Sequence, residues 1–251
     1  MSEDRGASPG AGEAVRLELV GRQLDERIAA RFPLGKRLRV LDVGMGRGTQ
    51  ALRLARGGHE VTGVEREPEH LAAVRAAAAA EPEGIRSRMR VVEGDGRDTG
   101  VHFLPGSFDV VLCHGVLMHV EEPDALLAGL GRMLAPGGLL SVVVRNADAL
   151  AMRPGLRGDW GGALAAFGAH TYRDEAGGEV RAHRLDALSQ ALAGIAAPLV
   201  AWYGVRVFSE ATEIPEAGAA LDALLAAEER AGRTEPYRRV ASMLHLCGGR
   251  D

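Results

Sequence analysis

Three glycines at alternate positions follow a short apolar run in the stretch LDVGMGRGTQA, residues 41–51. Glycine has no Cβ, so a loop built from it lets the backbone come close to a ligand. The carboxylate of Asp42 can accept hydrogen bonds from the loop N–H groups or from a ligand ammonium group. This pattern predicts a loop that binds a nucleotide-like cofactor. The expected binding residues are Asp42, Gly44, Met45, Gly46 and Gly48.

Acidic residues follow the next apolar runs. Glu65 ends VTGVE, where an acidic side chain can accept hydrogen bonds from both hydroxyls of a ribose. We expect its neighbour Arg66 to be a cofactor-binding residue as well. In VVEGDG, Asp95 can accept from an adenine amino group while the Gly96 N–H reaches a ring nitrogen. NAD and S-adenosylmethionine both carry a ribose and an adenine. The spacing GxGxG, in place of the GxGxxG of dinucleotide-binding loops, favours S-adenosylmethionine.

Short apolar runs alternate with longer helical patterns as far as residue 144. We expect strands at 38–43, 60–65, 89–93, 108–113 and 139–144, and helices at 13–31, 49–56, 68–80 and 123–134. This alternation predicts parallel strands joined by right-handed crossovers. Ligands of such sheets bind beyond the carboxyl ends of the strands, where the glycine loop, Glu65 and Asp95 are expected.

The last part of the chain departs from this alternation. There we expect a helix at 185–196, a strand at 200–208, a helix at 216–230 and a last run at 239–246, with the two final strands as an antiparallel pair. The expected fold class is α/β, a Rossmann-like, doubly wound, mostly parallel seven-stranded sheet with an antiparallel C-terminal strand. We expect one domain over 13–251 after a flexible tail at 1–12. Within it, 146–184 is expected to be a lid or acceptor-binding insertion.

Five pieces of sequence carry a family resemblance. In order, LDVGMGRG, VTGVE, VVEGDG, FDVVLCHGVLMHV and LAPGGLL resemble the class I S-adenosylmethionine-dependent methyltransferases. The whole series is needed, because a glycine triplet after a strand is often only a turn. The resemblance implies a methyltransferase that uses S-adenosylmethionine.

A narrower resemblance covers nearly the whole chain. AVRLELVGRQLDERI, RNADALAM, YGVRVF and TEPYRRVASMLHL are similar to the tRNA methyltransferases that esterify uridine 5-oxyacetic acid at the wobble position. The resemblance implies that Arg16 grips the cofactor carboxylate, that His114 lies at the cofactor edge, and that the tRNA anticodon region is the partner. A guanidinium suits a carboxylate, although Arg16 can also be a solvated helix residue and His114 a packed strand-end histidine.

The stretch FGAHTYRDEAGGEVRAHR departs from that family. The family has a lysine run in this part of the chain, whereas here scattered arginines are diluted by acids. Attraction to phosphates is correspondingly weaker. A small-molecule carboxylate or hydroxyl acceptor is therefore the alternative to tRNA.

Arg206 is the main candidate on the acceptor side. It lies between two valines in GVRVF, and strand alternation places it on the face opposite to theirs. Facing the cleft, it can align a carboxylate for in-line attack on the methyl group; facing outward, it is a surface residue. An ionised carboxylate needs no general base.

For a hydroxyl acceptor, His119 or His114 is the base to test, though His119 can equally belong to packing at a helix entry. Further acceptor-site candidates are Arg145, Asn146, Tyr203, Tyr237 and Arg238.

Composition argues against several other classes. A net charge of -4 gives no overall basic field of the kind that holds nucleic acid mainly through its phosphates. Two isolated cysteines predict neither disulfides nor a metal site. No apolar run reaches the roughly 20 residues of a membrane span, so we expect a cytoplasmic protein without a membrane role. Lys36 is the only lysine, which weakens an NAD-dependent oxidoreductase with a Tyr/Lys pair. A non-catalytic module that binds the cofactor is the other alternative to a methyltransferase. The sequence does not predict the oligomeric state.

Overall fold

The computed structural model describes residues 10–173 and 177–251. Its main sheet is built from β1 (Arg39–Val43), β2 (Glu60–Glu65), β3 (Met89–Glu93), β4 (Phe108–His114), β5 (Leu134–Arg145), β8 (Leu199–Val205) and β9 (Met243–Gly249). The strand order is β3-β2-β1-β4-β5-β9-β8, and β9 runs antiparallel to both of its neighbours while the other pairs are parallel. This confirms the predicted fold class.

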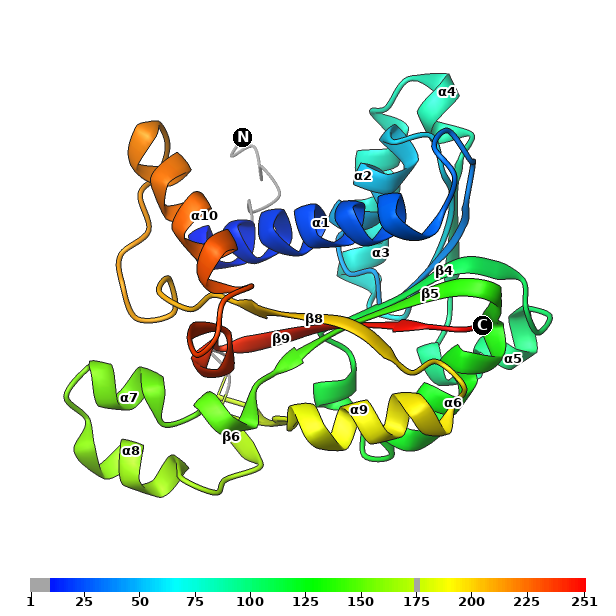
Figure 1. Ribbon diagram of the computed structural model, residues 1–251. Helices are drawn as coiled ribbons and strands as arrows, with labels where there is room; N and C mark the ends of the chain where they lie inside the picture. The colour runs from blue at the N-terminus through cyan, green and yellow to red at the C-terminus, as the bar shows by residue number, and fades with distance from the viewer. Residues whose placement is uncertain (1–9, 174–176) are drawn as a thin grey trace.

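Helices cover both faces of the sheet (Figure 1). On one face lie α1 (Ala11–Arg31), α2 (Thr49–Arg56) and α10 (Ala219–Ala231), and on the other lie α6 (Pro123–Met133) and α9 (Leu185–Gly194). The shorter crossovers contain α3 (Pro68–Ala79), α4 (Glu83–Arg86) and α5 (Thr99–His102). No helix in the described part of the chain is long and apolar enough to cross a membrane.

Alternation along the inner strands explains why both faces are apolar. Val40 of β1 and Val110 of β4 pack in one core cluster with α1 and α2. Their neighbours Leu41 and Val111 pack in a second cluster with α6 and α9. Inner parallel strands are buried on both faces and so carry continuous apolar runs, which made them recognisable in the sequence.

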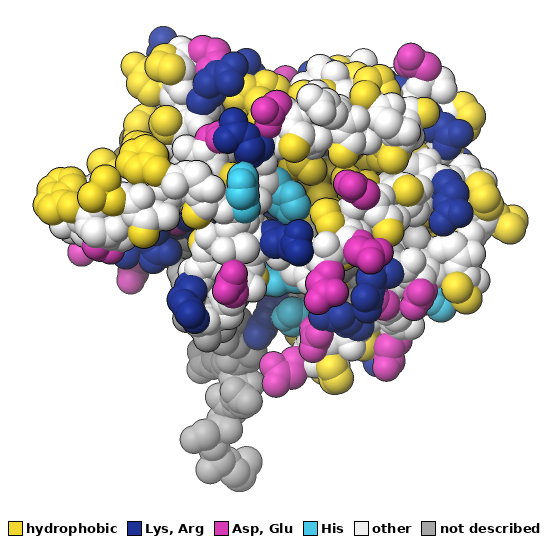
Figure 2. All heavy atoms as spheres, turned by 90° about the horizontal axis from the view of Figure 1, so that it is seen from below, with side chains coloured by type: hydrophobic (Ala, Val, Ile, Leu, Met, Phe, Trp, Pro, Cys, Tyr) yellow, Lys and Arg dark blue, Asp and Glu magenta, His cyan; other side chains and the backbone are white. Residues whose placement is uncertain are grey.

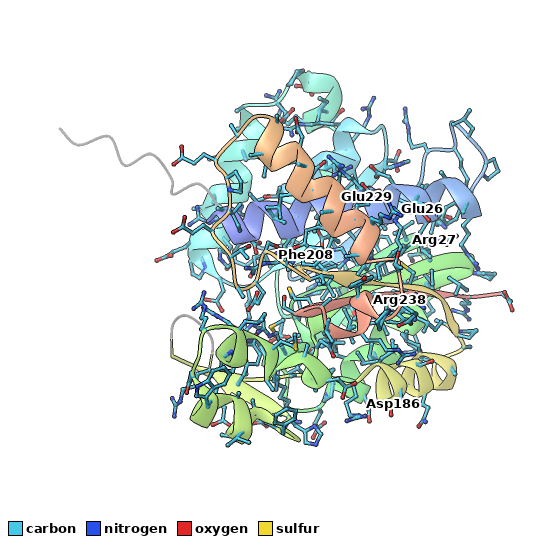
Figure 3. The ribbon with its side chains drawn as sticks, turned by 60° about the vertical axis from the view of Figure 1, so that its left-hand side comes forward. Glu26, Arg27, Asp186, Phe208, Glu229 and Arg238 are labelled. Carbon is cyan, nitrogen blue, oxygen red and sulfur yellow. The ribbon has the colours of Figure 1, made fainter. Side chains whose placement is uncertain are left out.

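The N-terminal helix is fixed by α10. Glu26 of α1 and Glu229 of α10 lie close together in Figure 3, and the guanidinium of Arg233 pairs with them at 2.5 and 2.9 Å. Arg22 of α1 lies 3.3 Å from Glu229. The first turns of α1 pack over the carboxyl ends of β5 and β8, where Val15 and Leu19 share a core cluster with Val143 and Val205.

The strand expected at 200–208 is three residues too long at its end. β8 stops at Val205, and Arg206 has φ of 61°, a left-handed conformation that is uncommon for a residue with a Cβ. The physical reason is Glu228 of α10, whose carboxylate accepts the backbone N–H groups of Val207 and Phe208 at 2.7 and 2.9 Å. These bonds draw the chain out of the sheet, so the alternation argument does not decide where Arg206 points.

The described part of the segment 146–184 contains the 3-10 turn η3 (Ala147–Ala149), two short helices and a pair of antiparallel strands. The helices and strands are α7 (Met152–Leu156), α8 (Trp160–Ala166), β6 (Thr171–Arg173) and β7 (Glu179–Arg181). In Figure 1 this segment stands beside the sheet, below α10. A lid role for it stays a prediction. Of the expected tail, residues 1–9 lie outside the described residues, and residues 11 and 12 belong to α1. The last strand is shifted toward the C-terminus relative to 239–246 and follows a 3-10 turn, η4 (Tyr237–Val240).

Candidate active site

A cavity of about 930 Å³ lies at the carboxyl ends of the central strands. Predicted residues that line it are Gly44, Gly46, Glu65, Arg66, Asp95, Gly96, His114 and His119. The other predicted residues, Arg16, Asp42, Met45, Gly48 and Arg206, are not part of its lining. Charged lining residues that sequence reasoning did not single out are Glu67, His70, Arg97, Glu121 and Glu122.

The three loop glycines serve different purposes. Gly44, Gly46 and Gly48 all have positive φ, at 66°, 56° and 80°. A Cβ on Gly44 would overlap Val116, and one on Gly48 would overlap Val74 of α3, so packing requires glycine at both positions. Around Gly46 nothing lies within 4 Å of a Cβ position. Gly46 is therefore the point at which the backbone is open to a ligand.

Glu65 joins the end of β2 to the glycine loop. Its Oε2 accepts the backbone N–H of Gly46 at 2.7 Å, and its Oε1 accepts those of Arg66 and Glu67 at 2.9 and 3.0 Å. The residue is 6% exposed and lines the cavity. A carboxylate has about four acceptor positions, so capacity remains for hydroxyl donors of a ligand.

Asp95 is held by an arginine that sequence reasoning missed. Arg97 donates to both carboxylate oxygens, at 2.9 and 2.7 Å, and its backbone N–H donates as well at 2.9 Å. The hydrogen bond from the Arg97 side chain, together with the Arg66 charge, holds the pKa of Asp95 well below its ordinary value. A ligand amino group would therefore share this ionised carboxylate with Arg97. The only signal in the sequence is an arginine two residues after the acid.

Asp42 and Met45 lie behind the cavity wall. Asp42 is 3% exposed, and burial, with a smaller effect of the Glu65 charge, raises its pKa to about 7. The Met45 side chain packs against the backbone of Gly63, where a Cβ would overlap its sulfur. The Met45 side chain is thus turned into the protein, and only its backbone belongs to the glycine loop.

His114 and His119 line the cavity, and Arg16 lies near His114 without being part of the lining. His114 ends β4, and burial, with smaller effects of the neighbouring His245 and of the Arg16 charge, holds its pKa well below the ordinary value, so the ring is neutral. His119 ends the 3-10 turn η2 (Leu117–His119) and is exposed to the cavity. Arg16, on α1, donates to Glu13 at 2.8 Å. The ligand contacts expected of these residues stay predictions.

The donor set of the cavity fits a nucleoside with a cationic tail. Gly46 offers an open backbone, while Glu65 and Asp95 provide carboxylates along one wall. Asp42 lies buried beneath the loop with a raised pKa, which the approach of a cation would lower. These features match the ribose, the amino-bearing base and the positive charges of S-adenosylmethionine.

Comparison with known proteins decides the family. Residues 41–142 match the family described as methyltransferase domain. The tRNA 5-carboxymethoxyuridine methyltransferase of Escherichia coli (strain K12) is 30% identical over 233 residues, covering 92% of this chain and 87% of that protein. The chain belongs to the class I S-adenosylmethionine-dependent methyltransferases. This confirms the family predicted from the sequence and S-adenosylmethionine as the cofactor.

Other relatives of this methyltransferase differ in what they act on. The ubiquinone biosynthesis O-methyltransferase of Xanthomonas euvesicatoria pv. vesicatoria (strain 85-10) is 32% identical over 161 residues, 64% of this chain and 62% of that protein. The magnesium protoporphyrin IX methyltransferase of Synechocystis PCC 6803 shares the fold, with a TM-score of 0.62 at 15% identity over 98% of this chain and 90% of that one. The fold and cofactor therefore leave the acceptor open.

Three arginines surround one carboxylate beyond the ends of β5 and β8, where the sequence predicted an acceptor site. Glu210 lies 2.9 Å from Arg145 at the end of β5, 3.1 Å from Arg206 and 3.7 Å from Arg153. The side chains of Glu210 and Arg145 are 9% and 11% exposed. Burial opposes ionisation of Glu210, but the Arg145 and Arg206 charges outweigh it and lower its pKa. The cluster holds one negative and three positive charges.

Two side chains connect the arginine cluster to the turn that contains His119. The Arg145 guanidinium lies 4.9 Å from the ring centre of Tyr172, whose hydroxyl is 3.5 Å from the sulfur of Met118. Met118 belongs to the same turn as His119, which lines the cavity. Sequence reasoning named Arg206 and, more weakly, Arg145, but it did not find Glu210. The spacing of four residues between Arg206 and Glu210 is the signal that was available.

Proposed function

We propose that this methyltransferase transfers the methyl group of S-adenosylmethionine to the carboxylate of 5-carboxymethoxyuridine, that is uridine 5-oxyacetic acid, at the wobble position of tRNA. The product is the methyl ester. We further propose that it acts on the anticodon region of tRNA in the cytoplasm. The similarity to the tRNA 5-carboxymethoxyuridine methyltransferase over 92% of the chain supports this acceptor.

The observation that carries the proposal is the convergence of Arg145 and Arg206 on a carboxylate. Glu210 shows that the two guanidinium groups can grip a carboxylate between the ends of β5 and β8. The Nε atoms of both arginines are buried without a hydrogen-bond partner among the described residues. Arginine forks match carboxylates in shape and charge. An acceptor carboxylate is the ligand that this surplus of positive charge favours.

The reaction asks for alignment rather than for a base. An oxygen of the ionised carboxylate forms the new bond to the methyl carbon, and the electron pair of the broken carbon–sulfur bond stays on sulfur. No proton is released, because the carboxylate has already lost its proton at neutral pH. The arginines have to hold the carboxylate in line with the methyl group and shield it from water. They must do so without neutralising its nucleophilic oxygen fully.

Exposed aromatic residues near the arginine cluster suit a single-stranded nucleic acid. Figure 2 shows hydrophobic side chains gathered at one end of the molecule, the end that α7 and α8 form in Figure 1. There Trp160 and Phe167 are 70% and 73% exposed. Arg153 and Arg157 belong to α7 and its C-terminal cap. Aromatic rings and arginines are the side chains on which unstacked bases stack.

Label transfer tests the proposal directly. The protein is incubated with methyl-labelled S-adenosylmethionine and tRNA that carries 5-carboxymethoxyuridine, with tRNA carrying unmodified uridine as the control. We expect label only in the modified tRNA, in a nucleoside that loses the label as methanol in mild base, as an ester does and an ether does not. Absence of label in tRNA that carries the free acid would rule the proposal out.

A small-molecule O-methyltransferase is the second candidate. It is supported by the similarity to ubiquinone biosynthesis O-methyltransferases and by His119, an exposed histidine on the cavity wall that can serve as general base for a hydroxyl. In this case label appears in small phenols or acids and not in tRNA. His119→Asn then lowers kcat for a phenol, whereas for a carboxylate acceptor kcat is unchanged.

A further inference from the structure

Four polar side chains, three of them buried, form a chain that links the cavity to α1. Nε2 of His114 is 2.8 Å from Oγ of Ser141, which is 2.8 Å from Nε2 of His245. Nδ1 of His245 is in turn 2.8 Å from Oε1 of Gln23. Gln23, Ser141 and His245 are at most 1% exposed. Such a polar chain between apolar neighbours needs every member to be matched in donor and acceptor role.

The orientation of the Gln23 amide sets the direction of the hydrogen bonds in this chain. The amide presents its oxygen to Nδ1 of His245 at 2.8 Å. An amide oxygen only accepts, so with the amide in this orientation His245 carries its proton on Nδ1 and accepts at Nε2. The Ser141 hydroxyl then donates to His245 and its oxygen accepts from Nε2–H of His114. His114 is thereby left with an unprotonated Nδ1, the ring nitrogen that is not engaged by the chain.

Neither ring can escape this assignment by becoming charged. Burial lowers the pKa of His245 to about 3. Burial, the neighbouring His245 and the Arg16 charge hold the pKa of His114 well below its ordinary value. Both imidazoles are therefore neutral at physiological pH, and each carries a single proton whose place depends on its hydrogen-bond partner.

The sheet order shows which part of the cofactor His114 faces. From β3 through β2 and β1 to β4, the strand ends place Asp95, Glu65, the glycine loop and His114 in a row. With the adenine expected at Asp95 and the ribose at Glu65, the methionyl half extends toward His114, which lines the cavity. That half carries an ammonium group and a sulfonium group beside one carboxylate, so its net charge is positive.

We propose that Gln23 and Ser141 are positioning residues that keep the proton of His114 on Nε2, so that the Nδ1 lone pair faces the cationic methionyl half of S-adenosylmethionine. A lone pair attracts a cation there, whereas an N–H group at the same place repels it. The proposal depends on the cofactor and not on the identity of the methyl acceptor. It gives a role to three residues that lie outside the cavity lining.

Replacing Gln23 makes the chain reverse. In Gln23→Leu, Nδ1–H of His245 loses its acceptor, and a buried N–H without a partner is strongly disfavoured. The His245 proton therefore moves to Nε2, the Ser141 hydroxyl turns to donate to Nε2 of His114, and the His114 proton moves to Nδ1. The number of protons is unchanged. A substitution on α1 thus converts the His114 nitrogen that faces the cofactor from acceptor to donor.

Nitrogen-15 NMR of histidine-labelled protein measures the tautomer. We expect wild-type His114, assigned through His114→Asn, to show an unprotonated Nδ1 and a protonated Nε2. Gln23→Leu is expected to exchange the two signals, and Ser141→Ala to give a mixture. Gln50→Leu is the matched control, because Gln50 is also buried beside α1, where its Nε2 donates to the Leu17 carbonyl at 2.7 Å without touching the chain. A protonated Nδ1 in wild-type His114 would overturn the proposal.

Calorimetry with two ligands provides the functional arm. We expect Gln23→Leu to weaken binding of S-adenosylmethionine about fivefold, the effect of one hydrogen bond, and Gln50→Leu to leave it within twofold. S-adenosylhomocysteine keeps the ammonium but has a neutral sulfur. Equal weakening of both ligands identifies the ammonium as the group at Nδ1, and weakening of S-adenosylmethionine alone identifies the sulfonium. Unchanged affinity for both ligands in a folded Gln23→Leu protein whose His114 tautomer has reversed would refute the functional role.

Discussion

The backbone N–H of Gly46 donates a hydrogen bond of 2.7 Å to Oε2 of Glu65, and this bond ties the open point of the glycine loop to the acidic end of β2. The same carboxylate holds the first residues after β2 through its other oxygen. Glu65 therefore shapes the cavity before any ligand arrives. Its expected contact with the ribose uses what remains of its acceptor capacity.

Glu65→Gln is expected to weaken binding of S-adenosylmethionine about tenfold or more. An amide has one acceptor oxygen and brings an NH₂ group to a place where backbone N–H groups point, so at least one charge-assisted hydrogen bond is lost. Calorimetric titration of the folded variant measures the effect. Glu67→Gln is the matched control, since Glu67 lines the same cavity with a side chain that is 54% exposed. Equal affinities of the two variants would contradict the role given to Glu65.

Cofactor affinity is expected to rise with pH from about 6 to 8. The pKa of Asp42 is raised to about 7 in the free protein by burial and by Glu65, so a large part of the group is protonated near neutral pH. A cationic ligand favours the ionised form and releases this proton on binding, and the affinity therefore increases as pH passes through 7.

The same shift has the opposite effect on the stability of the free protein. Because the folded protein binds this proton more tightly than the unfolded chain, the Asp42 contribution to the free energy of unfolding falls as pH rises from about 4 to 7. Asp42→Asn is expected to remove the pH dependence of the cofactor affinity and the Asp42 contribution to the pH dependence of the free energy of unfolding. Affinity measured at pH 6 and pH 8, beside urea unfolding at the same values, checks the two signs. A wild-type affinity that is the same at both pH values would refute the linkage.

Much of the fold was predictable because it depends on local patterns. The inner strands are buried on both faces and so appear as apolar runs, and the glycines after β1 and the acid at the end of β2 are adjacent to their strands in sequence. The expected order of strands and helices up to residue 144 is confirmed by the structure. The predicted end of β8 was wrong because the strand is ended by hydrogen bonds to Glu228, which lies on a helix later in the chain.

Most of the features of the site that were missed depend on tertiary contacts. The hydrogen bonds from Arg97 to Asp95 join residues only two positions apart, so the sequence contained a signal for them. The pairing of Arg145 with Glu210 joins residues 65 positions apart, and the chain from His114 to Gln23 uses four separate elements. Polar residues of this kind look like ordinary strand or loop residues until the sheet order brings them together.

Arg206→Gln and Arg145→Gln are each expected to raise KM for the carboxylate acceptor about tenfold or more. Each removes a charge-assisted hydrogen bond that helps to hold a carboxylate, and neither residue lines the cofactor cavity. The Kd of S-adenosylmethionine should therefore stay within twofold. Arg153→Gln is the control, because Arg153 lies farther from Glu210, at 3.7 Å, and its side chain is 37% exposed. Parallel losses in Kd and KM would assign these arginines to the cofactor instead.

Two neighbouring glutamates of α10 are expected to differ sharply in their effect on stability. Glu228 is 1% exposed and accepts the backbone N–H groups of Val207, Phe208 and Ser209 together with the Ser209 hydroxyl, all within 2.9 Å. Its neighbour Glu229, labelled with Phe208 in Figure 3, forms partly exposed ion pairs with Arg22 and Arg233.

Glu228→Gln is expected to lower the free energy of unfolding by about 2 kcal/mol, because the amide keeps one acceptor oxygen for several donors. Glu228→Leu leaves the backbone N–H groups unpaired and should cost about 4 kcal/mol. Glu229→Gln should cost less than about 1 kcal/mol, as exposed ion pairs usually do. Urea unfolding of the three variants gives the order.

The turn that Glu228 holds also sets the left-handed backbone of Arg206. Glu228→Gln should therefore raise KM for the acceptor while the Kd of the cofactor is unchanged. A loss of stability with an unaltered KM would separate this turn from the acceptor site.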